Sequence, residues 1–376
     1  MSTFTTRLRV LTQQGEANRY VIWAVLGLSA IGALAVSSTT EALLNNHLLR
    51  VGVAVSAAAL FSVIDYRWLA RWSKVLLVGT FVLLVVVKLM GAQEGGATRW
   101  LRVAGVGFQP SDLAKVALVL YIAVLLARKQ AYIQSFTRAF LPVGLWLMAT
   151  VVLIGLEDLS TALVLLVAVT LMCFVARVSV LQLMGTGLVA LVLAVALLST
   201  SPQRAARVES FVGMKLFPHT TEAVFDEQGE GYQARQARIA LAMGGLFGRG
   251  MGQSVQRDFL PEPSNDFIFA IIGEEYGFLG VVVVLGLFGL FLFQGFLRIA
   301  RAAPDPLGLF MATGLTTVIV LFGLVHAGVS AGLFPVTGLA LPFVSYGGTS
   351  LLANGVMVGI LLNISRQARP LAEATS

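Results

Sequence analysis

The stretch DFIFAIIGEEYGFLGVVVVLGLFGLFLFQGFL, residues 266–297, decides the fold. Its apolar residues continue well past the roughly 20 that a helix needs to cross a bilayer. Carboxylates interrupt it, Asp266 at its start and Glu274 and Glu275 inside it. Because a carboxylate in hydrocarbon is costly, each of them requires a binding partner or a function. The stretch therefore predicts a membrane-spanning helix that carries an acidic site.

The rest of the chain has the composition of a membrane protein. Of its 376 residues, 57% are hydrophobic and 12% are charged, whereas about 25% are charged in an ordinary soluble domain. We expect an all-α polytopic membrane protein of about ten transmembrane helices, forming one domain over residues 1–376. The first run lacks a small-residue cleavage site, so it is predicted to be a retained helix and not a signal peptide. The candidate spans lie at about 19–38, 47–64, 73–90, 111–127, 139–156, 161–178, 181–199, 266–297, 307–328 and 347–364.

Cysteine and histidine exclude two kinds of site. Cys173 is the lone cysteine, so the chain cannot form an intramolecular disulfide. The histidines, His47, His219 and His326, are far apart and lack the short spacing typical of a zinc site. No structural metal is therefore predicted.

The distribution of Lys and Arg predicts the orientation. If the N-terminus is cytoplasmic, every short loop on that side carries at least one basic residue, as membrane proteins prefer. Basic residues on the opposite side gather at 99–102 and 204–257. We expect both termini to be cytoplasmic and residues 200–265 to form a large extracytoplasmic loop between helices 7 and 8. Within it, 233–248 has a basic start and an apolar continuation, which is typical of a helix at the membrane surface.

Two interpretations fit GGATRWLRVAGVGFQPSDLAK, residues 95–115. Structurally, Trp100 anchors the membrane interface, and Asp112 pairs with Lys115 at helical spacing. Functionally, three cations, Arg99, Arg102 and Lys115, together with the Trp100 ring hold an anionic headgroup such as a pyrophosphate, because Arg offers forked donors and Lys a point charge. Spacing alone leaves both open.

Two further stretches are polar or broken where a span should be apolar. In GLEDLSTALV, residues 155–164, Glu157 and Asp158 could cap the following helix or take part in chemistry. GLFPVTGLALPFVSYGGTSLLANG, residues 332–355, is a loop interrupted by Pro and Gly. Irregular backbone at membrane depth is tolerated where it is buried in protein or lines a cavity, so this loop predicts a cavity.

The acidic residues of the opening stretch differ in expected role. Asp266 could cap the helix that starts there, but Ser264 and Asn265 could cap it equally well. On a continuous helix, Glu274 would lie roughly 12 Å deeper and Glu275 would face the opposite side. Asp266 is thus the carboxylate expected to meet a substrate at the surface. The glutamates are expected to brace the bundle through hydrogen bonds or a basic partner.

Several long strings then resemble one family in order and spacing. GATRW, QPSDLAK, GYQARQARIALAMGGLFGRGMGQS, LPEPSNDFIFAIIGEEYGFLG and LFPVTGLALPFVSYGGTS are similar to the SEDS family (shape, elongation, division and sporulation), whose members include FtsW and RodA. The resemblance covers nearly the whole chain from about residue 50. Around 231–280 it is closer to the division member, FtsW, than to RodA.

The resemblance implies a glycosyltransferase that polymerises lipid II, the undecaprenyl-pyrophosphate disaccharide peptide, into peptidoglycan strands on the outer face of the bacterial cytoplasmic membrane. Asp266 matches the family's essential aspartate, as general base. Arg99, Trp100 and Lys115 fall on its substrate cavity, and Asp112, Glu274 and Ser345 are further candidate substrate-binding residues. No cofactor is implied, and a divalent cation is left open. The expected partners are a class B penicillin-binding protein transpeptidase and other division or elongation proteins, with no nucleic acid.

The chain departs from the family's usual residues at several positions, and two other functions compete with the glycosyltransferase interpretation. The family usually has Glu at Asp112, Pro-Asp-Leu-Gly at 157–160 and Asn at His326, and we favour a packed His326 over a cavity residue. A lipid II flippase would use the same cations, and a scaffold would only recruit a transpeptidase. Asp266 discriminates among them, since a flippase has no evident need for an isolated carboxylate at the outer face.

Overall fold

The computed structural model describes residues 16–94, 97–103, 106–214, 216 and 230–368. Within these residues, nine helices are long and apolar enough to cross a membrane, and α7 (Leu159–Val175) is a shorter apolar helix of 17 residues. The prediction of an all-α polytopic protein with about ten membrane helices is confirmed. The nine are α2 (Arg19–Thr39), α3 (Glu41–Val63), α4 (Tyr66–Met90), α5 (Pro110–Arg128), α6 (Leu141–Gly155), α8 (Val180–Ser199), α11 (Ile268–Phe293), α12 (Pro306–Ser330) and α13 (Gly348–Arg366). Two of these spans are extended by π-helices, η2 (Phe136–Phe140) before α6 and η5 (Gln294–Ala300) after α11.

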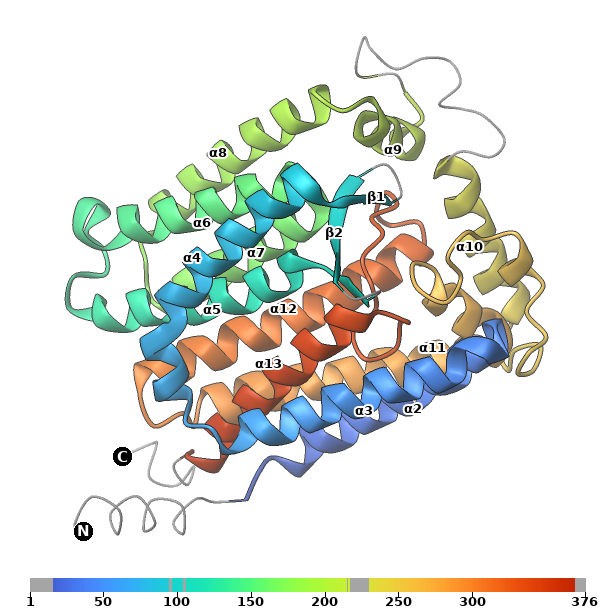
Figure 1. Cartoon of the computed structure of the whole chain (residues 1–376), viewed down its shortest axis with the longest axis horizontal. Coiled ribbons are helices and arrows are strands. Elements are labelled where there is room, and N and C mark those ends of the chain that lie inside the picture. The colour runs from blue at the N-terminus through green and yellow to red at the C-terminus, as the bar shows by residue number, and fades with distance from the viewer. Residues whose placement is uncertain (1–15, 95–96, 104–105, 215, 217–229, 369–376) are drawn as a thin grey trace.

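The helices form one bundle with two distinct ends (Figure 1). At one end, which we call the terminal end, the backbone amide of Asn18 donates to the Ser365 hydroxyl at 3.0 Å. The Asn18 side chain also donates to Gln294 at 2.9 Å. The opposite end, which we call the loop end, carries the short strands, α9 (Pro202–Val212) and α10 (Glu230–Gly244). The first and last spanning helices therefore meet at the same end.

Asp305 fastens the terminal end. Its carboxylate caps α12 by accepting from the Gly308 amide at 2.8 Å, and it accepts from the Tyr66 hydroxyl at 2.9 Å. The Arg67 guanidinium pairs with the same carboxylate at 2.7 Å. Burial alone would raise the pKa of Asp305, but these hydrogen bonds and the Arg67 charge lower it below its ordinary value. The ionised form is thus part of the fold.

This linkage predicts a pH dependence of stability. A carboxyl whose pKa is lower in the folded protein stabilises it above the unfolded pKa of about 4, and that contribution is lost as the pH falls through the folded pKa. We expect Asp305→Asn to lower stability by roughly 1–3 kcal/mol at pH 7 and the difference from wild type to shrink below about pH 4. Thermal unfolding in detergent between pH 3 and pH 7 measures it. A difference that is constant across this range would contradict the expectation.

Burial separates central from peripheral helices. In α5 and α12, 78% of the spanning window is buried in the protein, whereas in α8 the share is 11%. Leu118 and Ile122 of α5 and Leu315 and Ile319 of α12 are fully enclosed. The apolar side chains of α8 instead cover its outer surface, as expected for a helix that faces lipid.

A small antiparallel sheet covers the loop end. Strands β1 (Ala92–Glu94), β2 (Ala97–Val103) and β3 (Val106–Phe108) follow α4 and pair in the order β1-β2-β3. The residues between the spans predicted at 73–90 and 111–127 were expected to form a loop. Leu101 pairs with Phe108 across β2 and β3, and the strand-prone residues Thr98, Trp100 and Val103 are the signal that was missed.

Helix α10 packs against the start of α11. Its small residues Ala237 and Ala240 are buried against Phe267, Ala270 and Ile271. The helix predicted at 233–248 thus begins at Glu230 and ends at Gly244. Its apolar face covers the segment next to Asp266.

Helix α11 is broken, and this corrects the continuous helix predicted from residue 266. Gly277 has φ 66° and ψ −161°, which is outside the helical region. The amides of Arg249 and Gly250 donate to the carbonyls of Glu274 and Glu275, each at 3.0 Å. In turn, the amide of Phe278 donates to the carbonyl of Gly245 at 2.8 Å. Residues 245–250 therefore supply the hydrogen bonds that the break removes, which makes it tolerable at membrane depth.

Candidate functional site

Asp266 lies in a turn before α11. The helix starts at Ile268 with Phe267 as its N-cap, and no side chain hydrogen bonds at that cap. The Asp266 amide donates to the Glu262 carbonyl at 3.0 Å. Its carboxylate lies beside Gly338, because a Cβ on that glycine would be 3.4 Å from Oδ2. The half-buried carboxylate thus faces the broken loop before α13.

That loop also holds the backbone next to Asp266. The Ser345 hydroxyl donates to the Asn265 carbonyl at 2.7 Å and accepts from the Leu341 amide at 2.8 Å. The Tyr346 amide donates to the Ser264 carbonyl at 3.0 Å. Ser345 was predicted to bind substrate, and in the structure it is 1% exposed with its hydroxyl engaged in these bonds. Its geometry is that of a residue that positions Asp266.

A buried cation is attached to the same loop. Lys115 Nζ lies 2.8 Å from Asp112 Oδ1, so the predicted pairing at helical spacing is present. The Thr349 hydroxyl donates to the other oxygen of Asp112 at 2.7 Å. Lys115 is 2% exposed and its ammonium lies 4.6 Å from the ring centroid of Phe322. Residues 345–349 therefore connect the Asp266 turn to the Lys115 charge.

The structure describes the other predicted residues of the outer loop, Arg99 and Trp100, only in part. Trp100 lies in β2, and a Cβ on Gly107 would be 3.3 Å from its ring, so the ring covers β3. Arg99 also lies in β2, but its side chain is outside the described residues. Its role stays a prediction.

Glu274 is used inside the protein. It is fully buried, and its carboxylate accepts from the Ser254 hydroxyl at 2.6 Å and from the amides of Val255 and Gln256 at 3.1 Å and 3.2 Å. Arg249 lies 3.7 Å away. These contacts confirm that Glu274 braces the bundle, because they tie the loop after α10 to the broken helix. Substrate binding by Glu274 stays a prediction.

His326 is enclosed beside the same loop. It is 1% exposed, and its Nδ1 lies 2.6 Å from the Leu339 carbonyl oxygen. This contact ties α12 to the residues that approach Asp266. The arrangement fits the packed role that we favoured.

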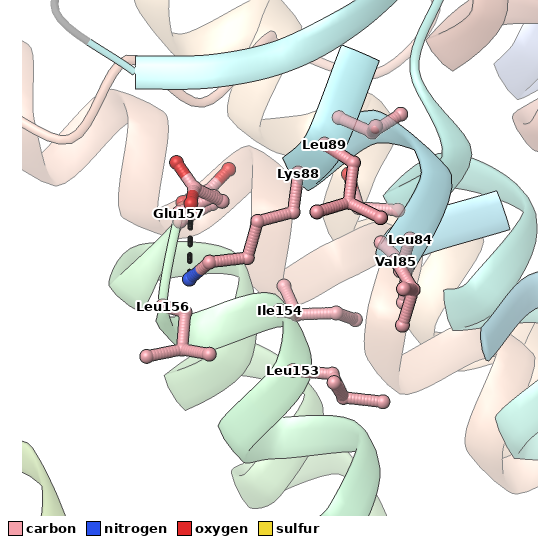
Figure 2. A pocket seen from close by; sticks show the side chains of 11 residues that line it. Leu84, Val85, Lys88, Leu89, Leu153, Ile154, Leu156 and Glu157 are labelled. Atoms are coloured by element: carbon pink, nitrogen blue, oxygen red, sulfur yellow. Dashed lines mark ion pairs between the residues drawn. The ribbon is translucent and has the colours of Figure 1, made fainter. Parts of the chain in front are cut away.

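A cleft opens at the loop end between α4, α5 and the turn from α6 to α7 (Figure 2). It contains about 560 Å³ of empty space, and apolar residues such as Leu84, Leu89 and Ile154 line most of it. At its mouth Lys88 pairs with Glu157 at 3.6 Å, as Figure 2 shows. The cleft also borders Ser111, the neighbour of Asp112. An apolar cleft with a charged mouth is suited to a lipid-linked molecule.

Asp158 explains the second polar stretch. Its carboxylate accepts from the Thr161 amide at 3.1 Å and from the Thr161 hydroxyl at 2.9 Å, and it is the N-cap of α7. The capping interpretation is therefore confirmed for this residue.

Sequence reasoning missed Thr349 and Ser254. Thr349 donates a hydrogen bond to Asp112 although the two are 237 residues apart in sequence. Ser254 donates a hydrogen bond to Glu274 from the loop after α10. Their position inside the strings LPFVSYGGTS and GRGMGQS was the available signal. Without a known contact, a hydroxyl in such a string could not be assigned a partner.

Taken together, the fold and site define a class: a polytopic helical membrane protein with a carboxylate and a buried cation joined at one end of the bundle. A sequence model of the FtsW, RodA and SpoVE cell cycle proteins matches residues 17–370. The chain therefore belongs to the FtsW/RodA/SpoVE family, and the expected resemblance is confirmed.

The chain is similar to relatives and to solved structures over most of its length and of theirs. The chain is 40% identical over 327 residues to stage V sporulation protein E of Bacillus subtilis, covering 86% of this chain and 87% of the relative. It is 36% identical to a probable peptidoglycan glycosyltransferase FtsW of Trichlorobacter lovleyi, covering 95% of each. A chain from a peptidoglycan synthase complex, described for the coordination of polymerization and crosslinking, matches with TM-score 0.77 at 27% identity, over 93% of this chain and 98% of that one. The Thermus thermophilus rod shape determining protein RodA matches with TM-score 0.69 at 27% identity, over 94% and 98%.

Proposed function

We propose that the protein is a peptidoglycan glycosyltransferase that polymerises lipid II into glycan strands. The observation that carries the proposal is the loop before α13, which attaches both the Asp266 turn and, through Thr349 and Asp112, the Lys115 cation. Relatives named as peptidoglycan glycosyltransferases support the activity. The loop end faces outward in this proposal, with both termini in the cytoplasm of a bacterium.

The reaction requires a base and a cation at one site. Asp266 accepts the proton of the acceptor sugar hydroxyl, whose oxygen attacks the anomeric carbon of the donor. The bond from that carbon to the pyrophosphate breaks, and the pyrophosphate leaves with the electron pair. Lys115, together with Arg99, stabilises the leaving charge, because fixed donors in a site that excludes water act more strongly than donors in solution. Asp112 and Ser345 position these groups.

A transpeptidase partner fits the same proposal. The structural relative from a peptidoglycan synthase complex matches nearly all of this chain. We expect a class B penicillin-binding protein to bind here, with other division or elongation proteins assembling around the pair. A crosslinked strand requires both activities, so proximity of the two enzymes is useful.

Lys115 provides a test that separates structure from chemistry. Lys115→Met leaves the buried carboxylate of Asp112 without its cation, and breaking a buried pair costs roughly 3–5 kcal/mol. We expect Asp112→Asn combined with Lys115→Met to recover most of that stability, since no buried charge is then left alone. Activity should stay low in the double variant because the cation is missing. Thermal unfolding and the rate of polymer formation measure the two effects.

The matched control is Asp112→Asn alone, which keeps the lysine. If the double variant regains activity together with stability, Lys115 is only structural.

Transport of lipid II is the competing function. Proteoliposomes that contain lipid II can be assayed for glycan polymer and for movement of the lipid between leaflets. Polymer without movement supports the enzyme. Movement without polymer, unaffected by Asp266→Asn, would establish a transporter instead.

A further inference from the structure

Arg50 is a half-buried cation inside a membrane-spanning helix. It lies nine residues after Glu41, the first residue of α3, which is about 13 Å along the helix axis. Its guanidinium stacks 4.0 Å from the ring centroid of Tyr346 and donates to the Tyr346 carbonyl at 3.2 Å. Among the described residues, no Asp or Glu forms an ion pair with it. A charged residue at this depth marks a functional site unless a partner neutralises it.

Among the described residues, the groups that contact Arg50 carry no negative charge. One turn away, His47 is fully buried, and neither of its ring nitrogens has a hydrogen-bond partner among the described residues. Its ring lies 6.1 Å from that of Tyr346. Gly348, the first residue of α13, lies beside the guanidinium. The start of a helix also favours an anion. Among the described residues, nothing that contacts Arg50 balances its positive charge. An anionic ligand is therefore suited to this corner.

An apolar groove begins next to this corner. It lies between α2, α3 and α13, which run side by side in Figure 1, and contains about 820 Å³ of empty space. Val51 and Leu351 line it near Arg50, and Ser62 and Leu362 line it near the terminal end. On α3 it thus extends over eleven residues, or about 16 Å. Its apolar lining and its length suit a hydrocarbon chain.

We propose that this groove binds the polyisoprenyl chain of a lipid-linked substrate or product and that Arg50 binds its diphosphate. The choice of carrier lipid rests on the proposed function. A guanidinium offers paired donors to phosphate oxygens, and the groove accepts the chain that such an anion carries. The Tyr346 amide holds Ser264, two residues before Asp266, so the Arg50 corner and the proposed base share one support.

The probe for this site is undecaprenyl diphosphate with a diazirine in its chain, added to the full-length protein in nanodiscs. After irradiation, mass spectrometry maps the labelled peptides. In the wild-type protein we expect labels in α2, α3 and α13. Arg50→Gln should reduce labelling by about tenfold, in line with the loss of one hydrogen bond to a charged group. Arg50→Lys should retain an intermediate level because it keeps the charge.

Two valines provide a matched pair on α3. Val55 lines the groove and is 42% exposed, whereas Val53 is 49% exposed and is outside it. Val55→Trp should block labelling, and Val53→Trp should label as the wild-type protein does. Each variant is used only if it elutes as a single symmetric peak in gel filtration.

Several results would contradict the proposal. Wild-type labelling in Arg50→Gln, or equal loss from Val53→Trp and Val55→Trp, would remove the site. Competition by phosphatidylglycerol as strong as that by unlabelled undecaprenyl diphosphate would make it a general site for anionic lipid. Labelling should survive Asp266→Asn, so failure of polymerisation and failure of binding are seen separately.

Discussion

We expect Asp266→Asn to fold and insert as the wild-type protein does and to make no detectable glycan strand. Asparagine keeps the shape of the side chain but cannot accept the proton of the acceptor hydroxyl. General-base catalysis contributes ~10²–10⁴-fold, so the initial rate should fall by at least that lower factor. The residue lies in a turn and is half-buried, so the change should cost little stability. The rate of polymer formation from lipid II, normalised to folded protein, is the measurement.

Asp258→Asn is the control for this prediction. Asp258 lies in the same large loop, in the short helix η4 (Gln256–Asp258), and its side chain is 77% exposed. This variant should retain wild-type activity. A similar loss from both variants would point to a disturbed loop and not to a missing base.

The second large effect is expected at the break in α11. A Cβ on Gly277 would lie 2.3 Å from the Gly248 amide nitrogen and 2.7 Å from the Leu246 carbonyl, and both contacts are with backbone. Its φ of 66° adds strain for any residue with a branched side chain. Gly277→Val should therefore destabilise the protein by more than about 4 kcal/mol or prevent its accumulation. Yield and thermal unfolding in detergent measure this.

Gly286→Val and Gly289→Val are matched controls in the same helix. No atom lies within 4 Å of a Cβ added at either position. Both variants should accumulate normally. If Gly277→Val is as stable as they are, residues 245–250 do not pack into the break as described.

Much of the fold followed from apolar run length. Each predicted run corresponds to a helix, because a spanning segment must satisfy its own backbone and so reveals itself in composition. The predicted starts at 47 and 73 were late, since α3 and α4 begin at Glu41 and Tyr66 with polar turns that hydropathy excludes. The break at Gly277 was not predictable, because it depends on hydrogen bonds from residues 245–250, which lie earlier in the chain and reach the break only in the folded protein.

The site was predicted in part. The pairing of Asp112 with Lys115 follows from helical spacing, and the bracing role of Glu274 follows from the cost of a buried charge. Thr349 and Arg50 were not identified. Thr349 meets Asp112 only because α13 packs beside α5. Arg50 stands out only once it is known that no carboxylate among the described residues pairs with it.

Two carboxylates of the opening stretch, Asp266 and Glu274, have separate explanations. Glu274 is satisfied within the protein by Ser254 and the amides that follow it. Asp266 stands outside the helix, with its turn held by Ser345 and Tyr346. This difference in position, with Glu274 buried among loop residues and Asp266 in a turn outside the helix, is why we propose the chemistry at Asp266.

The most direct test of that assignment is glycan formation by the purified full-length chain with lipid II as its substrate, with and without a class B penicillin-binding protein, resolved on a gel. We predict a ladder of glycan strands from the wild-type protein and none from Asp266→Asn under either condition. Equal ladders from the two proteins, or none from the wild-type protein with its partner present, would contradict this prediction.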